Sequence, residues 1–146
     1  MAYKLSIFIN NISIIFISCL VGLVTGTFSE TLLALVAFVL LRRFSGGSHA
    51  KKLTACLIIS TFLISSIPHI PTPESLLTPI NFITLVLVAL FAPSHCEVNA
   101  IPDHARHKYK MISLILVATN FFFIGSTIIS LSFLAQALFL INFHRR

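Results

Sequence analysis

Hydrophobic residues occur along this chain in long, nearly uninterrupted runs rather than in the alternating patterns of soluble helices and strands. A helix needs about 20 residues to cross a bilayer, or about 17 at the short end. The first run is long enough for one crossing, and the last, with 33 residues, for two short crossings joined by a turn near Gly125. The pattern therefore predicts membrane-spanning helices, with these five apolar stretches: Leu5–Thr27, Thr31–Leu41, Leu53–Ile67, Leu76–Ala92 and Met111–Phe143.

Composition supports this prediction. Hydrophobic residues make up 57% of the 146 residues and charged residues 10%, against about 25% charged in an ordinary soluble protein. A soluble domain of this size has too much surface to cover with so few charges. We therefore expect an all-α integral membrane protein with a single domain over residues 1–146.

The basic residues indicate how the chain is threaded. Suppose that the N-terminus is cytoplasmic, that each of the first four stretches crosses once and that the last crosses twice. Every Lys and Arg then falls inside, as the positive-inside rule requires. Glu30 and Glu74 then fall outside, the latter beside the turn formed by Pro68, Pro71 and Pro73. We predict about six spans with both termini cytoplasmic; four spans with re-entrant segments are the alternative. Because topology explains the +6 net charge, we expect no nucleic-acid partner.

Two cytoplasmic loops, near residues 42–52 and 93–110, contain most of the remaining polar residues. The apolar stretches contain no Asp, Glu, Lys or Arg, which argues against an ion-coupled pump because such proteins place ionisable residues within the membrane. The three cysteines have no regular spacing, so a disulfide framework is not expected.

The first loop carries candidate catalytic residues. Gly46 and Gly47 release the backbone before His49, and Cys56 follows seven residues later. A thiol becomes a nucleophile when a base takes its proton, and neighbouring positive charge stabilises the thiolate. In one continuous helix the two residues would lie about 10 Å apart along the axis. A His49–Cys56 pair therefore requires His49 to fold back over the helix start, or to meet Cys56 only when substrate closes the site.

The segment Arg42-Arg43-Phe44-Ser45-Gly46-Gly47-Ser48-His49-Ala50, followed by Cys56, resembles the accessory gene regulator B (AgrB) family. Members of that family are polytopic membrane cysteine endopeptidases that process quorum-sensing propeptides in Gram-positive bacteria. Phe91-Ala92-Pro93 and Ile101-Pro102, followed by basic residues, are similar to the family's second cytoplasmic loop. The chain departs from the family in having only four residues before the first stretch and a sparser second loop, with Arg106, Lys108 and Lys110.

The resemblance implies a function in the bacterial cell membrane with the active site facing the cytoplasm. Cys56 would be the nucleophile and His49 its base. The substrate would be an AgrD-like signal propeptide, cleaved through a thioester and then closed into a thiolactone or lactone ring. Arg42 and Arg43 would hold the acidic peptide tail or anchor the helix at lipid headgroups, and Gly46 and Gly47 are candidate oxyanion donors. We expect no cofactor and no metal.

Two other functional classes fit parts of the sequence. A small peptide exporter or channel without chemistry would share the compact polytopic design. A metal-handling protein would use His95, Cys96, His104 and His107, although a structural zinc site normally pairs its ligands more tightly.

Polar and small residues within the stretches predict helix–helix contacts. Gly22-x-x-x-Gly26 is a candidate face for close helix packing and for a homodimer. One of the intramembrane amides, Asn81, is placed toward the active site in this interpretation. We expect most of the amides to form hydrogen bonds between helices: Asn10, Asn11, Asn81, Asn120 and Gln136.

Overall fold

The computed structural model describes residues 2–45, 53–92 and 102–144. These residues form six α-helices and no strand, so the expected all-α class is confirmed for the described part of the chain. Two 3₁₀ turns, η1 (Ile67–His69) and η2 (Glu74–Leu76), precede α4, and a π-helical turn, η3 (Asn120–Ile124), follows α5. The helices are α1 (Ala2–Thr25), α2 (Phe28–Ser45), α3 (Leu53–Ser66), α4 (Leu77–Phe91), α5 (Asp103–Thr119) and α6 (Thr127–His144).

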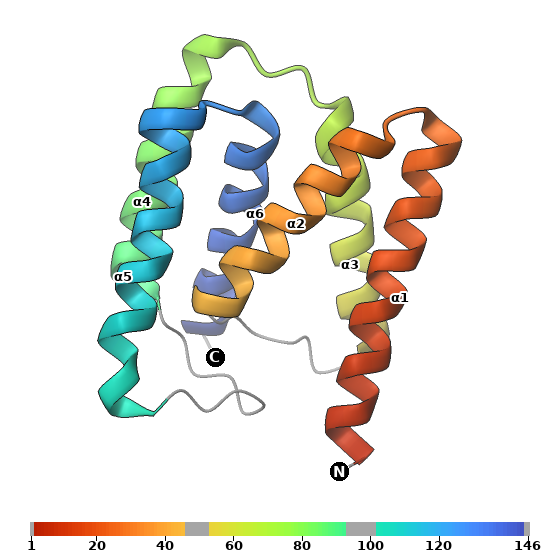
Figure 1. The fold of residues 1–146 in the computed structure, drawn as a ribbon, viewed down its shortest axis with the longest axis horizontal. Coiled ribbons are helices and arrows are strands. Elements are labelled where there is room, and N and C mark those ends of the chain that lie inside the picture. The colour runs from red at the N-terminus through yellow and green to blue at the C-terminus, as the bar shows by residue number, and fades with distance from the viewer. Residues whose placement is uncertain (1, 46–52, 93–101, 145–146) are drawn as a thin grey trace.

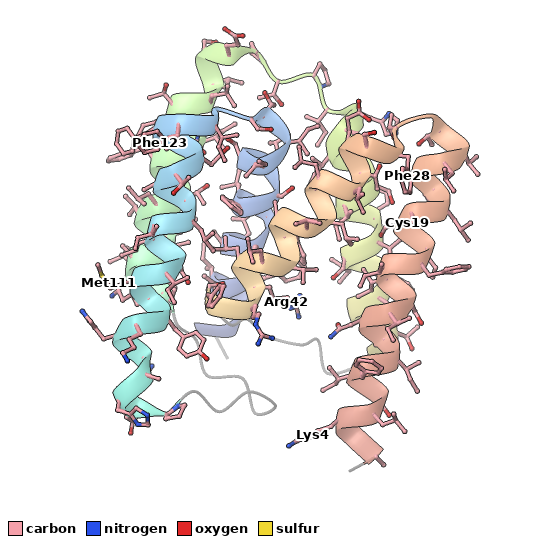
Figure 2. All side chains as sticks on the ribbon, in the orientation of Figure 1. Lys4, Cys19, Phe28, Arg42, Met111 and Phe123 are labelled. Atoms are coloured by element: carbon pink, nitrogen blue, oxygen red, sulfur yellow. The ribbon has the colours of Figure 1, made fainter. Side chains whose placement is uncertain are left out.

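Successive helices run in opposite directions, so the chain passes along the bundle six times, alternately up and down (Figure 1). Both termini lie at the same end of the bundle, together with the ends of α2 and α4 and the starts of α3 and α5. We call this end the basic end, because it carries Lys4, Arg42, Arg43 and the basic residues at the start of α5 (Figure 2). Glu30, in the first turn of α2, and Glu74, in η2, lie at the other end.

Helices α2 and α6 form the centre of the bundle. One hydrophobic core joins α2 and α6 to α4 and α5, and includes Leu41, Val88 and Leu140. A second core joins α2 to α1 and α3 through Phe38 and Ile64. Because α2 contributes to both cores, a residue at its end is positioned by the whole bundle.

The outer surface of the bundle is far more apolar than that of a soluble protein. Large apolar side chains such as Phe8, Phe16, Phe62 and Leu90 are more than half exposed. Twelve polar side chains, all Ser, Thr, Asn or Gln, are buried among the described residues. Polar interior contacts and an apolar outer surface suit helices surrounded by lipid, because lipid cannot hydrogen-bond a polar group.

Two helical segments are long and apolar enough to cross a membrane, Lys4–Thr25 and Glu74–Phe91. The apolar helices Leu57–His69 and Thr127–Ile141 are shorter. The helix number and the common end of both termini agree with the six-span prediction, whereas a crossing by every helix and the orientation in the membrane stay predictions.

The expected turn near Gly125 is present. Gly125 adopts a left-handed conformation with φ of 62°, and its N–H donates to the Asn120 carbonyl over 2.7 Å. Asn120 also specifies the turn through its side chain, since its Oδ1 accepts from the Ser126 N–H. The last apolar stretch therefore divides into two helices, because Gly adopts this conformation without steric cost.

The second loop differs from the sequence interpretation. Residues 103–110, expected in a loop, form the first turns of α5, which begins after Pro102. Proline is favourable at a helix start, and Asp103 in the first turn interacts well with the helix dipole. The rest of that loop, residues 93–101, lies outside the described residues.

Candidate active site

The candidate site lies at the basic end, where α2 stops and α3 starts (Figure 1). Cys56 is the fourth residue of α3, in its first turn. The Cys56 side chain lies outside the described part of the structure, as do the residues Gly46, Gly47 and His49. The described framework around them is the last turn of α2 and the residues of α5 and α6 that contact it.

Arg42 is held against two aromatic rings. Its guanidinium carbon lies 5.9 Å from the centre of the Phe38 ring and 6.0 Å from that of Phe139, and these rings make an edge-to-face contact with each other. Arg42 is half-buried, whereas its neighbour Arg43 is exposed. The rings stabilise a cation at a fixed place, because the faces of aromatic rings carry partial negative charge. The structure thus gives different environments to two arginines that the sequence does not distinguish.

The final residues of α2 also contact α5 and α6. The Phe44 ring lies 5.8 Å from the Tyr109 ring, centre to centre, and so joins α2 to the start of α5. Ser45, which is fully buried, accepts a hydrogen bond over 3.5 Å from Nε2 of Gln136, also fully buried. The residue immediately before Gly46 is therefore fixed by a side chain 91 positions further along the chain.

The second loop contributes no metal site in the described residues. His104 and His107 are exposed on α5, and no group of three His, Cys, Asp or Glu side chains there is arranged to hold a metal ion. The other two residues of the metal hypothesis, His95 and Cys96, lie outside the described residues. Nearby, Asp103 is 4.0 Å from the Arg106 guanidinium on the same helix.

We expect interhelical hydrogen bonds from most of the intramembrane amides, and three of the five, Asn81, Asn120 and Gln136, form such bonds. Asn120 donates to Asn81 over 3.4 Å and to Ser130 over 2.8 Å, and Gln136 donates to Ser45. Asn11 is exposed instead, and the buried Nδ2 of Asn10 has no hydrogen-bond partner.

The placement of Asn81 toward the active site is wrong. Asn81 lies near the start of α4 and contacts Asn120 beside the Gly125 turn, at the opposite end of the bundle from the start of α3. The predicted topology already places Glu74, only seven residues before Asn81, at the end opposite the cytoplasmic site, so this error was detectable from the sequence.

Gly22 of the Gly22-x-x-x-Gly26 motif packs closely against another helix of the same chain, as expected, whereas a homodimer through this face stays a prediction. A Cβ on Gly22 would lie 3.0 Å from Cβ of Thr31, so Gly22 allows the start of α2 to approach α1 closely. Gly26, with φ of 74°, ends α1. The motif therefore makes the α1–α2 hairpin.

Sequence reasoning missed Phe139 and Tyr109 as neighbours of the site. Both are aromatic residues in helices with many apolar residues, and no spacing connects them to Arg42 or Phe44. Gln136 was recognised as an interhelical hydrogen-bonding residue, but its partner was not. The only available signal was its amide group in an otherwise apolar stretch.

Comparison with known proteins identifies the family. The model of the family Accessory gene regulator B matches residues 1–142. The chain belongs to the accessory gene regulator B family. This confirms the resemblance inferred from Arg42–Ala50 and Cys56, and places the chain in a family of the accessory gene regulator quorum-sensing system.

The curated relatives are distant AgrB proteins from staphylococci. Accessory gene regulator protein B of Staphylococcus haemolyticus is 28% identical over 116 residues, covering 77% of this chain and 62% of the relative. The protein of Staphylococcus carnosus is 27% identical over 126 residues, covering 81% and 66%. The chain thus spans less than two thirds of the length of these AgrB proteins. No solved structure matches the chain.

Proposed function

We propose that this chain is a membrane-embedded cysteine endopeptidase that processes an AgrD-like signal propeptide. The observation that carries the proposal is the Arg42–Ala50 segment with Cys56 seven residues after His49, in a chain that belongs to the AgrB family. The position of Cys56 in the first turn of α3 supports the proposal. The amino end of a helix has partial positive charge, which stabilises a thiolate.

In the proposed reaction, His49 takes the proton of the Cys56 thiol. The thiolate sulfur attacks a backbone carbonyl carbon of the propeptide, and the C–N bond breaks. The proton passes from His49 to the leaving nitrogen, so the tail departs as a peptide with a free amino end. The remaining part stays on Cys56 as a thioester.

A thiol or hydroxyl of the bound peptide then attacks the thioester carbonyl. The new bond closes a thiolactone or lactone ring, and Cys56 leaves as a thiolate that regains a proton. Exclusion of water favours this cyclisation over hydrolysis. The exposed apolar surface of the helices around the basic end, including Ile58 on α3 next to the site, supports a location in contact with lipid.

Arg42 is the stronger candidate for binding the acidic tail of the propeptide. Its cation is held on Phe38 and Phe139, so little side-chain entropy is lost on binding a carboxylate. Arg43 extends into the surroundings, where the more suitable role is contact with lipid headgroups. Gly46 and Gly47 remain proposed oxyanion donors.

The proposal is tested with purified protein in lipid vesicles and a synthetic AgrD-like propeptide. We expect wild type to release the tail peptide and to carry a covalent peptide adduct on Cys56, detected by mass spectrometry. Cys56→Ser and His49→Ala should both lose the adduct and at least about a hundredfold in cleavage rate. Cys19→Ser is the matched control, because Cys19 lies on α1 and is a free cysteine outside the site.

Cleavage that survives Cys56→Ser would disprove the mechanism. Transport of the intact propeptide across the vesicle membrane without cleavage would favour the exporter alternative.

A further inference from the structure

Two groups of buried hydroxyls differ in how their hydrogen bonds are satisfied. A Ser or Thr within a helix can donate its hydroxyl proton to the backbone carbonyl four residues earlier. Buried hydroxyls on α4, α5 and α6 do so over 2.7 to 2.9 Å: those of Thr84, Ser113, Ser130 and Ser132. By contrast, the buried hydroxyls of Ser18 on α1 and of Thr61 and Ser65 on α3 have no hydrogen-bond partner among the described residues.

The unpartnered groups lie on two helices that pack side by side, α1 and α3 (Figure 1). On α1, Ile14 lies one turn from Ser18 and one turn from Asn10, whose buried Nδ2 also has no partner. On α3, Leu57 lies one turn before Thr61. Residues four apart on a helix share a face, and Ile14 and Leu57 pack in the same hydrophobic core. The unpartnered groups therefore face the interface between α1 and α3. We call this interface the polar seam, defined by four residues: Asn10, Ser18, Thr61 and Ser65.

The chemistry of the polar seam selects a small, uncharged partner that both donates and accepts hydrogen bonds. A hydroxyl does both, and the amide nitrogen of Asn10 donates. The seam contains no charged residue, and Asn10 and Ser18 are eight residues apart, which is about 12 Å along a helix. Lipid offers no hydrogen bond to such groups. Water does, and a buried water typically bonds to about three polar groups that would otherwise be unsatisfied.

The position of α1 allows the polar seam to open. The unpartnered atoms are buried in this packing, so water reaches them when α1 moves away from α3. Helix α1 lies at the edge of the bundle and packs mainly on α2 and α3. Its end is held where Gly22 lies against Thr31 of α2, whereas its start lies away from α2. A pivot about the α1–α2 hairpin would therefore open the seam at the basic end, where α1 begins.

We propose that the polar seam binds water inside the membrane-spanning bundle, and that this water enters from the basic end as α1 pivots away from α3. The hydrogen bonds that water makes to the unpartnered groups offset the apolar contacts that the two helices lose. The inference goes beyond the proposed function and does not depend on it, because it assigns no step of a reaction to the seam.

Single cysteines test whether the seam holds water, because a charged methanethiosulfonate reagent reacts with the thiolate, which forms in contact with water. Ser18→Cys is made in a full-length chain in which Cys19, Cys56 and Cys96 are replaced by Ser, and is reconstituted in lipid nanodiscs. Ser132→Cys is the matched control, since Ser132 is as fully buried as Ser18 but its hydroxyl is bonded within its own helix. We expect Ser18→Cys to react at least about tenfold faster, because the rate follows the population of the open seam.

The direction of entry is tested with intact cells and inverted membrane vesicles, which expose opposite sides of the membrane to the reagent. Lys4→Cys marks the basic end and Glu74→Cys the other end. We expect Ser18→Cys to be labelled from the side that labels Lys4→Cys. If Ser18→Cys fails to fold, Thr61→Cys on the facing helix gives the same readouts.

Two results would overturn the inference. The first is an equal reaction rate for Ser18→Cys and Ser132→Cys, whether both are slow or both are fast. The second is labelling of Ser18→Cys only from the side that labels Glu74→Cys. Neither measurement involves cleavage of a propeptide, so the inference and the proposed function fail separately.

Discussion

Single glycines in this chain have different physical roles. Gly22 lies against Thr31 and Phe28, and an added Cβ would come within 3.0 Å of Thr31 Cβ and 3.2 Å of the Phe28 backbone. Gly26 and Gly125 have open space around them, but both have positive φ, a conformation that other residues adopt only with strain. Substitution of Gly22 is thus opposed by close packing, and substitution of Gly26 or Gly125 by the backbone conformation.

We predict that Gly22→Ala destabilises the protein by about 1–3 kcal/mol, the typical cost of overpacking. The thermal midpoint of the purified protein in detergent would fall accordingly. Leu20→Ala is the control, because Leu20 is exposed on the outer surface of α1 and should change the midpoint little. An unchanged midpoint in Gly22→Ala would contradict the close contact between α1 and α2.

At the scale of an element, the last turns of α2 are the best-fixed part of the candidate site. Phe44 contacts Tyr109 of α5, Ser45 bonds to Gln136 of α6, and Arg42 lies over Phe139 of α6. A helix end usually frays, because its final carbonyl groups lack partners within the helix. Here contacts from two other helices oppose fraying directly before Gly46.

The adjacent arginines of this turn make a matched pair for testing substrate binding. We predict that Arg42→Gln raises KM for an acidic-tailed propeptide about fivefold or more, as expected for loss of about 1 kcal/mol or more of charge-assisted binding. Arg43→Gln should change KM less, since Arg43 is exposed. Cleavage assays with the acidic tail and with a neutralised tail give the comparison; equal effects of the two variants would contradict a special role for Arg42.

At the scale of the whole molecule, the described Lys and Arg residues gather at one end of the bundle. The six described basic residues lie at the end that holds both termini, and Glu30 and Glu74 lie at the other. A helical protein inserts with its Lys and Arg residues on the cytoplasmic side. The folded arrangement is therefore compatible with a single orientation in the membrane.

We predict that a cysteine at position 74 is labelled from outside intact cells and that one at position 4 is labelled only after permeabilisation. Glu74→Cys and Lys4→Cys would be made in a background in which Cys19, Cys56 and Cys96 are replaced by Ser. A membrane-impermeant thiol reagent provides the measurement. Labelling of both positions from the same side would refute the six-span topology.

The sequence by itself determined the helical class, the turn at Gly125 and the family, and it indicated the segment that is proposed to carry the chemistry. These features depend on local physics. Long apolar runs favour helices in lipid, and Gly125 permits the turn that divides the last run. The Arg42–Ala50 segment with Cys56 is a nearly contiguous pattern, so it indicates the family without any knowledge of long-range contacts.

Only the tertiary structure decided which residues share an end of the bundle and which partners they have. Gln136 and Ser45 are 91 residues apart, and Asn81 and Asn120 are 39 apart; no local pattern encodes either pairing. The same holds for Arg42 and Arg43. They are adjacent in the sequence, but only Arg42 lies over aromatic rings. Packing between helices decides which residues become partners. Many different apolar surfaces can pack against one another, so only the folded chain shows which pairs of surfaces are in contact.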